Sequence, residues 1–285
     1  ILVTAALAFL EGCGKITSVS IIKFYQILFS SFAMWVFTII GFHLYALAVY
    51  SLVTFVVGFL FVFLQFRNYF KDILTHKSSL PGIGWKDEIL PFQSRIAVSW
   101  IGGFLVFQLF TPIIFKMKGA VAAGQMGMSL QMINAMNSIA MVWISTKSPQ
   151  YGNYIAKKLR KQLDELFYLG VLQSSTLLIV IISIVLSFVF LLNQMHSEYS
   201  LRILPMPLFS ILCLVSFANH IVFAEATYLR AHKKDPFMEL SIVSGLVTLA
   251  LLILMVPSLG LAGAVYSYAI SSLLVGLLGG TVIFI

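Results

Sequence analysis

Charged residues are scarce in this sequence. Asp, Glu, Lys and Arg make up 10% of the 285 residues, whereas hydrophobic residues make up 60%, and the mean hydropathy is +1.00. Soluble globular domains carry about 25% charged residues. The composition therefore excludes a soluble domain and predicts a membrane protein. Apolar runs of about twenty residues recur along the chain, each long enough to cross the ~30 Å hydrocarbon core of a bilayer as a helix.

These runs also lack the alternation of polar and apolar residues that the strands of a membrane barrel need. We therefore predict an all-α, polytopic transmembrane helix bundle. The apolar runs predict a helical stub at 1–11 and eight full crossings, near 19–42, 44–66, 90–115, 119–146, 166–193, 203–228, 237–257 and 260–285.

Cysteine is rare as well, since Cys13 and Cys213 are the only two. We expect neither a disulfide nor a metal site, because no other ligand stands at a suitable spacing, and we expect no cofactor. Residues 12–17 include a Gly-Lys pair but lack the first glycine of a phosphate-binding loop, and no strand precedes them. The chain is therefore predicted to contain no nucleotide-driven engine.

Fifteen of the 18 Lys and Arg residues fall on one side of the predicted crossings, which assigns that side to the cytoplasm. The net charge of +8 is then an insertion signal and an attraction to the anionic lipids of a phospholipid bilayer, so we expect no nucleic-acid partner. The stretch 151–167 on this side has apolar and basic faces at helical spacing and predicts one amphipathic helix on the inner leaflet.

Two segments, 42–60 and 260–278, share a pattern at a shift of 218 positions: Ala46, Tyr50, Val57 and Gly58 coincide with Ala264, Tyr268, Val275 and Gly276. This repeat predicts two parallel six-helix lobes, an architecture found in transporters. Residues 1–66 would then be the end of the first lobe, 67–89 a cytoplasmic linker and 90–285 a complete second lobe. On this interpretation the first helices of the first lobe precede Ile1.

The predicted crossing 119–146 carries a polar stripe. Gln131, Asn134 and Ser138 recur at helical spacing, and Gln125 adds another amide. An amide that faces lipid without a hydrogen-bond partner costs several kcal/mol. These side chains should therefore line a hydrated cavity or bond to neighbouring helices. Neutral hydrogen-bonding groups suit hydroxyl-rich ligands such as sugars, so we treat them as substrate-binding candidates.

Charged residues within crossings are candidates for function. Glu11 and Glu225 occupy similar contexts, 9–12 and 223–226, near the cytoplasmic ends of their helices. They either reach the interface or bind a coupling cation, a proton or sodium. Arg95 is either a topology anchor or a bidentate contact for a diphosphate. His220 is predicted to form a hydrogen bond between helices.

The chain resembles polysaccharide-biosynthesis membrane proteins of the Wzx-type flippase group, within the multidrug/oligosaccharidyl-lipid/polysaccharide exporter superfamily, over most of 1–285 in helix order and most specifically over 90–170. The segments that carry the resemblance are 91–103, 110–115, 119–130, 143–147, 163–167 and 260–264. The resemblance implies a non-enzymatic flippase of the bacterial inner membrane. Its substrate would be an undecaprenyl-diphosphate-linked oligosaccharide for O-antigen, capsule or a similar glycan, carried by alternating access.

One departure from the family is plain, because its cavities tend to be cationic and the second lobe here offers mainly Arg95 among amides and hydroxyls. Two other functions stay open. A multidrug or small-cation exporter would have the same fold, and a polytopic glycan polymerase would need a large extracytoplasmic loop. The predicted extracytoplasmic connections are short, which argues against an enzyme.

Overall fold

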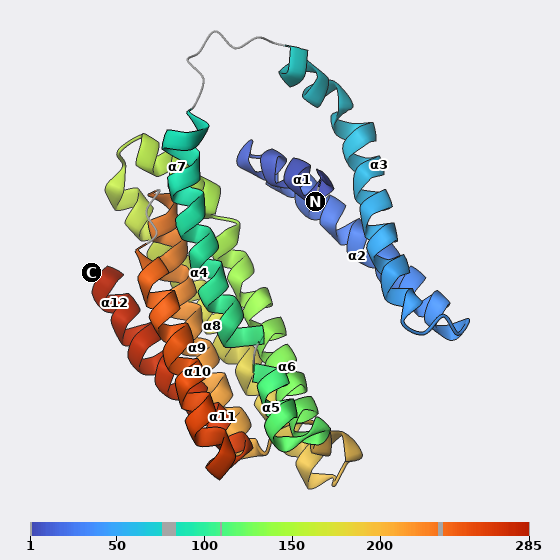
Figure 1. Ribbon diagram of the computed structural model, residues 1–285. Coiled ribbons are helices and arrows are strands. Elements are labelled where there is room, and N and C mark those ends of the chain that lie inside the picture. The colour runs from blue at the N-terminus through green and yellow to red at the C-terminus, as the bar shows by residue number, and fades with distance from the viewer. Residues whose placement is uncertain (1, 76–83, 109, 233–235, 285) are drawn as a thin grey trace. The chain divides into compact units, whose positions relative to one another are not determined.

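The computed structural model describes residues 2–75, 84–108, 110–232 and 236–284 (Figure 1). Within these ranges the regular elements are all helices. Six of the described helices are long and apolar enough to cross a membrane. The prediction of an all-α polytopic bundle is therefore confirmed, and the chain is a membrane protein. It divides into two compact units, residues 1–82 and 83–285.

The first unit consists of α1 (Leu2–Gly12), α2 (Ile16–Ile39) and α3 (Tyr45–Thr75). Its small core is formed by buried residues from all three helices, among them Leu7, Leu10, Ile22 and Phe66. The turn between α2 and α3 places Gly41 at φ 94°, a conformation that glycine adopts without strain.

Helix α3 continues to Thr75, past residue 66 where the sequence predicted the crossing to end. The residues of this extension are partly apolar and partly basic, so they do not form an apolar run. Tyr69 and Phe70 pack against the core of the first unit, while Arg67 and Lys71 are exposed. Part of the expected linker 67–89 is therefore helical, because packing and not hydropathy stabilises it.

The second unit contains α4 (Leu90–Gln108), α5 (Phe110–Lys118), α6 (Ala120–Ser145), α7 (Ser148–Ala156), α8 (Arg160–Gln194), α9 (Met206–Ala231), α10 (Phe237–Leu259) and α11 (Leu261–Ile270). Three further segments complete it: a π-helical turn at Trp85–Ile89, the π-helix η3 (Ser271–Leu278) and α12 (Gly279–Phe284). A short 3₁₀ helix, η2 (Glu198–Arg202), connects α8 to α9. The stretch from α11 through α12 is one apolar span.

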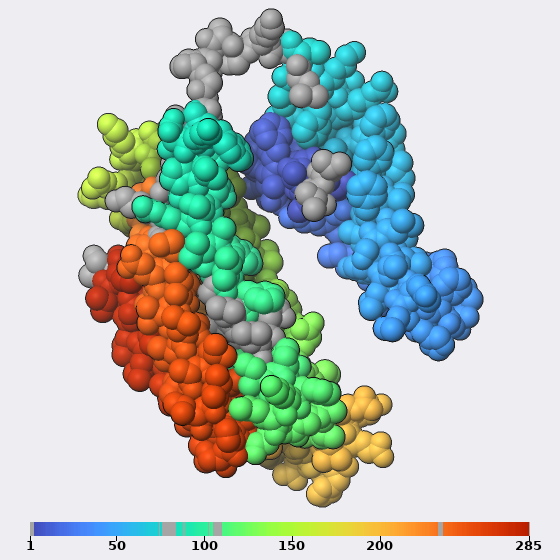
Figure 2. Space-filling view, viewed as in Figure 1, coloured from blue at the N-terminus to red at the C-terminus, as the bar shows by residue number. Residues whose placement is uncertain are grey.

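Helix α9 lies in the centre of the second unit. It packs against α6, α8, α11, η3 and α12, and its buried residues include Phe209, Leu212 and Val215. Around it, α4 packs on α10 and α5 packs on α6. Figure 2 shows side chains of α4 and α10 in contact over much of their length. A helix buried on several faces is a core helix of its bundle.

The sequence predicted eight crossings, whereas six described helices satisfy the length and hydropathy of a span. The two remaining predicted crossings do not satisfy these criteria, each for its own reason. The predicted crossing 90–115 corresponds to α4 and α5, two helices on either side of residue 109, which is outside the described residues. The predicted crossing 119–146 corresponds to α6, which has 26 residues but carries amides and hydroxyls that lower its hydropathy.

The amphipathic helix predicted at 151–167 is wrong as a single element. Helix α7 ends at Ala156, and α8 begins at Arg160. Lys158 between them has φ 57°, in the left-handed region that does not continue a helix. Tyr151 is fully buried, with its ring 6.3 Å from those of Phe167 and Tyr228, so aromatic packing holds α7 against the bundle.

Candidate functional site

The polar stripe of Gln131, Asn134 and Ser138 lies on the exposed face of α6. All three residues are exposed, while Ile133 and Ala140 on the opposite face are buried. The Ser138 hydroxyl donates to the carbonyl oxygen of Asn134 at 2.8 Å. Within the described residues, the side-chain amides of Gln131 and Asn134 form no hydrogen bond. The helix thus presents two uncommitted amides away from the core of its own unit.

Gln125 does not belong to this stripe. Its Nε2 donates to the carbonyl oxygen of Leu201 at 2.8 Å. One turn later, the Ser129 hydroxyl donates to Gln125 O at 2.8 Å and accepts from Leu204 N at 3.0 Å. These bonds attach the connection between α8 and α9 to α6. Gln125 therefore has a structural partner, and the structure does not bring it together with Gln131.

Arg95 is exposed on α4. Its helix packs chiefly on α10, whereas α6 packs on α5, α8 and α9. Among the described residues Arg95 forms no hydrogen bond or ion pair, so its guanidinium is free to meet an anion. The structure does not place it in contact with Gln131 or Asn134.

Glu225 is buried in α9, with 6% of its surface exposed. Its Oε1 accepts a hydrogen bond from the Thr281 hydroxyl of α12 at 3.3 Å. Its Oε2 has no hydrogen-bond partner among the described residues. A Cβ at Gly280 would lie 3.5 Å from this oxygen, so the glycine keeps the space beside it small but open.

A charged carboxylate in that position would have one neutral donor and little exposure to solvent. Burial of an uncompensated charge is costly enough that the group takes up a proton or pairs with a cation. Glu225 therefore remains a candidate for ion coupling. The groups of three or more His, Cys, Asp and Glu that typically hold a metal are absent from the described residues.

Glu11 has a different environment. Lys23 Nζ on α2 lies 2.6 Å from Glu11 Oε1. Both side chains are partly exposed, 39% for Glu11 and 52% for Lys23, and such pairs contribute about 0–1 kcal/mol. Glu11 already has a cationic partner, so it is a weaker candidate for ion coupling than its sequence context suggested.

Sequence reasoning missed most of the polar network inside the second unit. Among the hydrogen bonds that join α9 to its neighbours, Asn137 Nδ2 donates to Ser216 Oγ at 2.9 Å, Asn219 Nδ2 donates to Tyr268 Oη at 2.8 Å, and His220 Nε2 bonds Ser174 Oγ at 3.0 Å. The last bond confirms the interhelical role predicted for His220. The available signal was the run of polar residues in an apolar helix, which indicates buried partners but does not identify them.

Comparison of the chain with models of protein families, with curated proteins and with solved structures finds no match. The resemblance to Wzx-type flippases therefore stays a prediction from the sequence.

Proposed function

We propose that this chain belongs to a transporter of the bacterial inner membrane that moves a lipid-linked oligosaccharide, of the undecaprenyl-diphosphate type, by alternating access. The observation that carries the proposal is the exposed polar stripe of α6. Gln131 and Asn134 present amides on a helix of a membrane bundle and find no partner within the described residues. In contact with acyl chains, each amide would cost several kcal/mol.

That energy favours a hydrated cavity in front of α6. Amides and hydroxyls both donate and accept hydrogen bonds, as sugar hydroxyls do, so the stripe is chemically matched to an oligosaccharide. In the proposed cycle the sugars bind Gln131, Asn134 and Ser138, Arg95 holds a phosphate, and the lipid tail stays in the bilayer. No covalent bond is made or broken.

Coupling of transport to an ion gradient is assigned to Glu225. Its buried carboxyl, with one oxygen unbonded among the described residues, would exchange a proton or sodium ion as the lobes rearrange. Glu11 is not assigned this role, because Lys23 neutralises it.

A second candidate is an exporter of drugs or small cations with the same architecture. Burial of Glu225 within the second unit favours it, because a buried acid attracts cationic substrates. The two functions differ in their main contact: the first depends on the polar stripe of α6, and the second on Glu225.

The test uses the complete gene in its bacterial host. Deletion and Gln131→Leu should each reduce surface polysaccharide and cause lipid-linked precursor to accumulate on the cytoplasmic face. The matched control is Gln150→Leu, which makes the same change at an exposed glutamine of α7 and should leave display normal. Immunoblots establish equal protein levels. Normal polysaccharide in the deletion strain would refute the proposal, and increased drug sensitivity there would favour the second candidate.

The coupling residue is tested in the same host. Glu225→Gln should abolish the response of transport to the ion gradient, because it removes the charge and keeps the shape of the side chain. Glu11→Gln is the matched control, which breaks only a partly exposed ion pair. Equal effects of the two substitutions would contradict the assignment to Glu225.

A further inference from the structure

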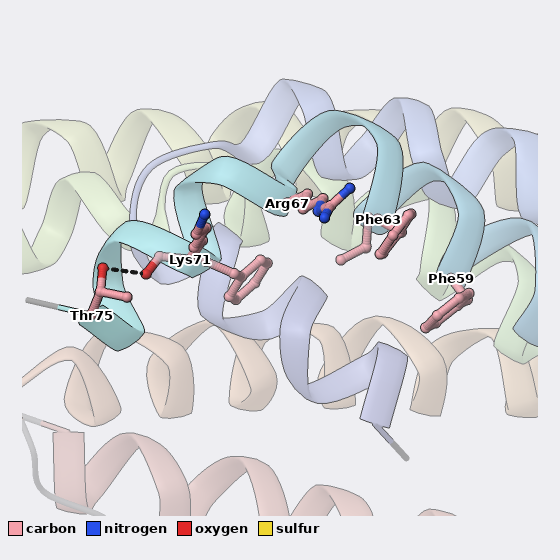
Figure 3. Close-up of a pocket in the computed structure, with 7 residues that line it drawn as sticks. Phe59, Phe63, Arg67, Lys71 and Thr75 are labelled. Atoms are coloured by element: carbon pink, nitrogen blue, oxygen red, sulfur yellow. Dashed lines mark hydrogen bonds between the residues drawn. The ribbon is translucent and has the colours of Figure 1, made fainter.

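Helix α3 carries a groove that the proposed function does not use. It has a volume of about 350 Å³. Figure 3 shows five of its side chains following one another along the helix: Phe59, Phe63, Arg67, Lys71 and Thr75. Each side chain lies about one turn after the last, so the row winds around the helix by roughly 160° from Phe59 to Thr75. The groove is lined by aromatic rings and by the apolar stems of Arg67 and Lys71, whose charged ends lie at the end of the groove away from Phe59.

The change from aromatic to basic side chains along α3 matches the change from acyl chains to headgroups across a membrane. At ~1.5 Å per residue, Phe63 lies ~27 Å and Arg67 ~33 Å along the axis from Tyr45, the end of α3 that the Lys and Arg distribution predicts to be extracytoplasmic. The hydrocarbon core is ~30 Å thick. The two phenylalanines therefore lie at the depth of acyl chains, while Arg67 and Lys71 lie at the depth of the inner-leaflet headgroups.

The basic end of the groove has uncompensated positive charge. The Arg67 guanidinium lies 5.2 Å from the centroid of the Phe63 ring, a cation–π contact that leaves its charge in place. Within the described residues neither Arg67 nor Lys71 forms a salt bridge. Asp72 is the next residue along, about 100° around the helix from Lys71, and it does not line the groove.

We infer that this groove binds one anionic phospholipid of the inner leaflet. Its phosphate lies between Arg67 and Lys71, and one acyl chain packs against Phe59 and Phe63. The volume is at the low end of ligand sites, ~300–1,000 Å³, and is sufficient for a headgroup phosphate and the start of an acyl chain. The site belongs to α3 of the first unit, and the inference does not depend on the proposed function.

The test is native mass spectrometry of the full chain with dioleoyl phosphatidylglycerol and, separately, dioleoyl phosphatidylethanolamine. These lipids share acyl chains and differ in net charge. The wild type should retain one phosphatidylglycerol in preference. A juxtamembrane cation contributes about a factor of five in affinity, so Arg67→Ala with Lys71→Ala should weaken phosphatidylglycerol binding about thirtyfold.

Two control variants separate this site from general charge and from misfolding. Lys157→Ala with Lys161→Ala removes two exposed charges elsewhere and should leave the preference unchanged. The exchange Arg67→Lys with Lys71→Arg keeps both charges and should retain it. Equal retention of the two lipids by the wild type, or an unchanged preference in the double alanine variant, would overturn the inference.

A photocrosslinker at position 59 identifies the occupant of the apolar end. With benzoylphenylalanine in place of Phe59, the inference predicts a protein adduct with the mass of one phospholipid. A crosslink to a peptide from residues 83–285 would show that protein covers the groove, and would also overturn the inference.

Discussion

A methyl group added at Gly263 should destabilise the hairpin of α10 and α11. The two helices are joined at Gly260, which has φ 60°, and the return of the chain brings Gly263 against the last turns of α10. A Cβ there would lie 2.6 Å from the carbonyl carbon of Met255 and 3.0 Å from Val256 N, and would also meet the oxygen of Met255. These are backbone atoms of a helix and cannot rotate away.

The size of the effect can be worked out from two opposing terms. Overpacking costs about 1–3 kcal/mol, and the rigid backbone places Gly263→Ala near the upper end. Alanine recovers about 1 kcal/mol of helix propensity relative to glycine. The free energy of unfolding should therefore fall by about 2 kcal/mol, which corresponds to a decrease in Tm of about 4–8 °C for a bundle of this size.

Thermal unfolding in detergent, followed by tryptophan fluorescence, measures this change. The matched control is Gly124→Ala on α6, an exposed site where a Cβ would meet nothing within 4 Å. The free energy of unfolding of the Gly124→Ala protein should rise by about 0.5–1 kcal/mol. If Gly263→Ala melts at the same temperature as Gly124→Ala, the close approach of α10 and α11 described above is refuted.

The same assay checks three further changes. Gly58→Ala should lower the free energy of unfolding by about 1–3 kcal/mol, because its Cβ would meet a methyl group of buried Val3 at 2.7 Å and the side chain of Gln26, whose Nε2 donates a hydrogen bond to Thr54 O; an unchanged Tm would contradict this. Tyr151→Phe should be neutral, because the buried hydroxyl has no partner among the described residues, whereas Tyr151→Ala should cost about 3–5 kcal/mol. Ser216→Ala should lower the free energy of unfolding by about 0.6 kcal/mol, the average for an interhelical hydrogen bond in a membrane. A loss above about 1.7 kcal/mol, the largest value for such bonds, would contradict this prediction.

Helix positions could be predicted because the bilayer leaves the backbone so few choices. The run 237–257 became α10, Phe237–Leu259, and the run 203–228 became α9, Met206–Ala231. The predictions were less accurate where helices leave the hydrocarbon. There α3 continues to Thr75, because a helix in water still satisfies its own hydrogen bonds, and hydropathy carries no signal of its end.

The candidate site was predictable in part for a related reason. Periodicity alone placed Gln131, Asn134 and Ser138 on one face of α6, and the structure exposes that face. The same reasoning set Gln125 beside this stripe but could not identify what it binds. Its partner is the backbone carbonyl oxygen of Leu201, in the connection between α8 and α9. A backbone partner cannot be predicted from the pattern of side chains.

The two glutamates show why likeness of sequence does not transfer chemistry between the halves of the chain. Glu11 and Glu225 occupy matching contexts, yet Glu11 has a lysine at 2.6 Å and Glu225 has a hydroxyl at 3.3 Å. The energy of an ion pair at a partly exposed site changes little when another ion binds nearby, because the charges are already balanced and screened. A buried carboxyl with one neutral partner responds strongly to any cation that enters. Of the two acids, Glu225 is therefore the one whose protonation or ion binding could alter the packing of α9 against α12.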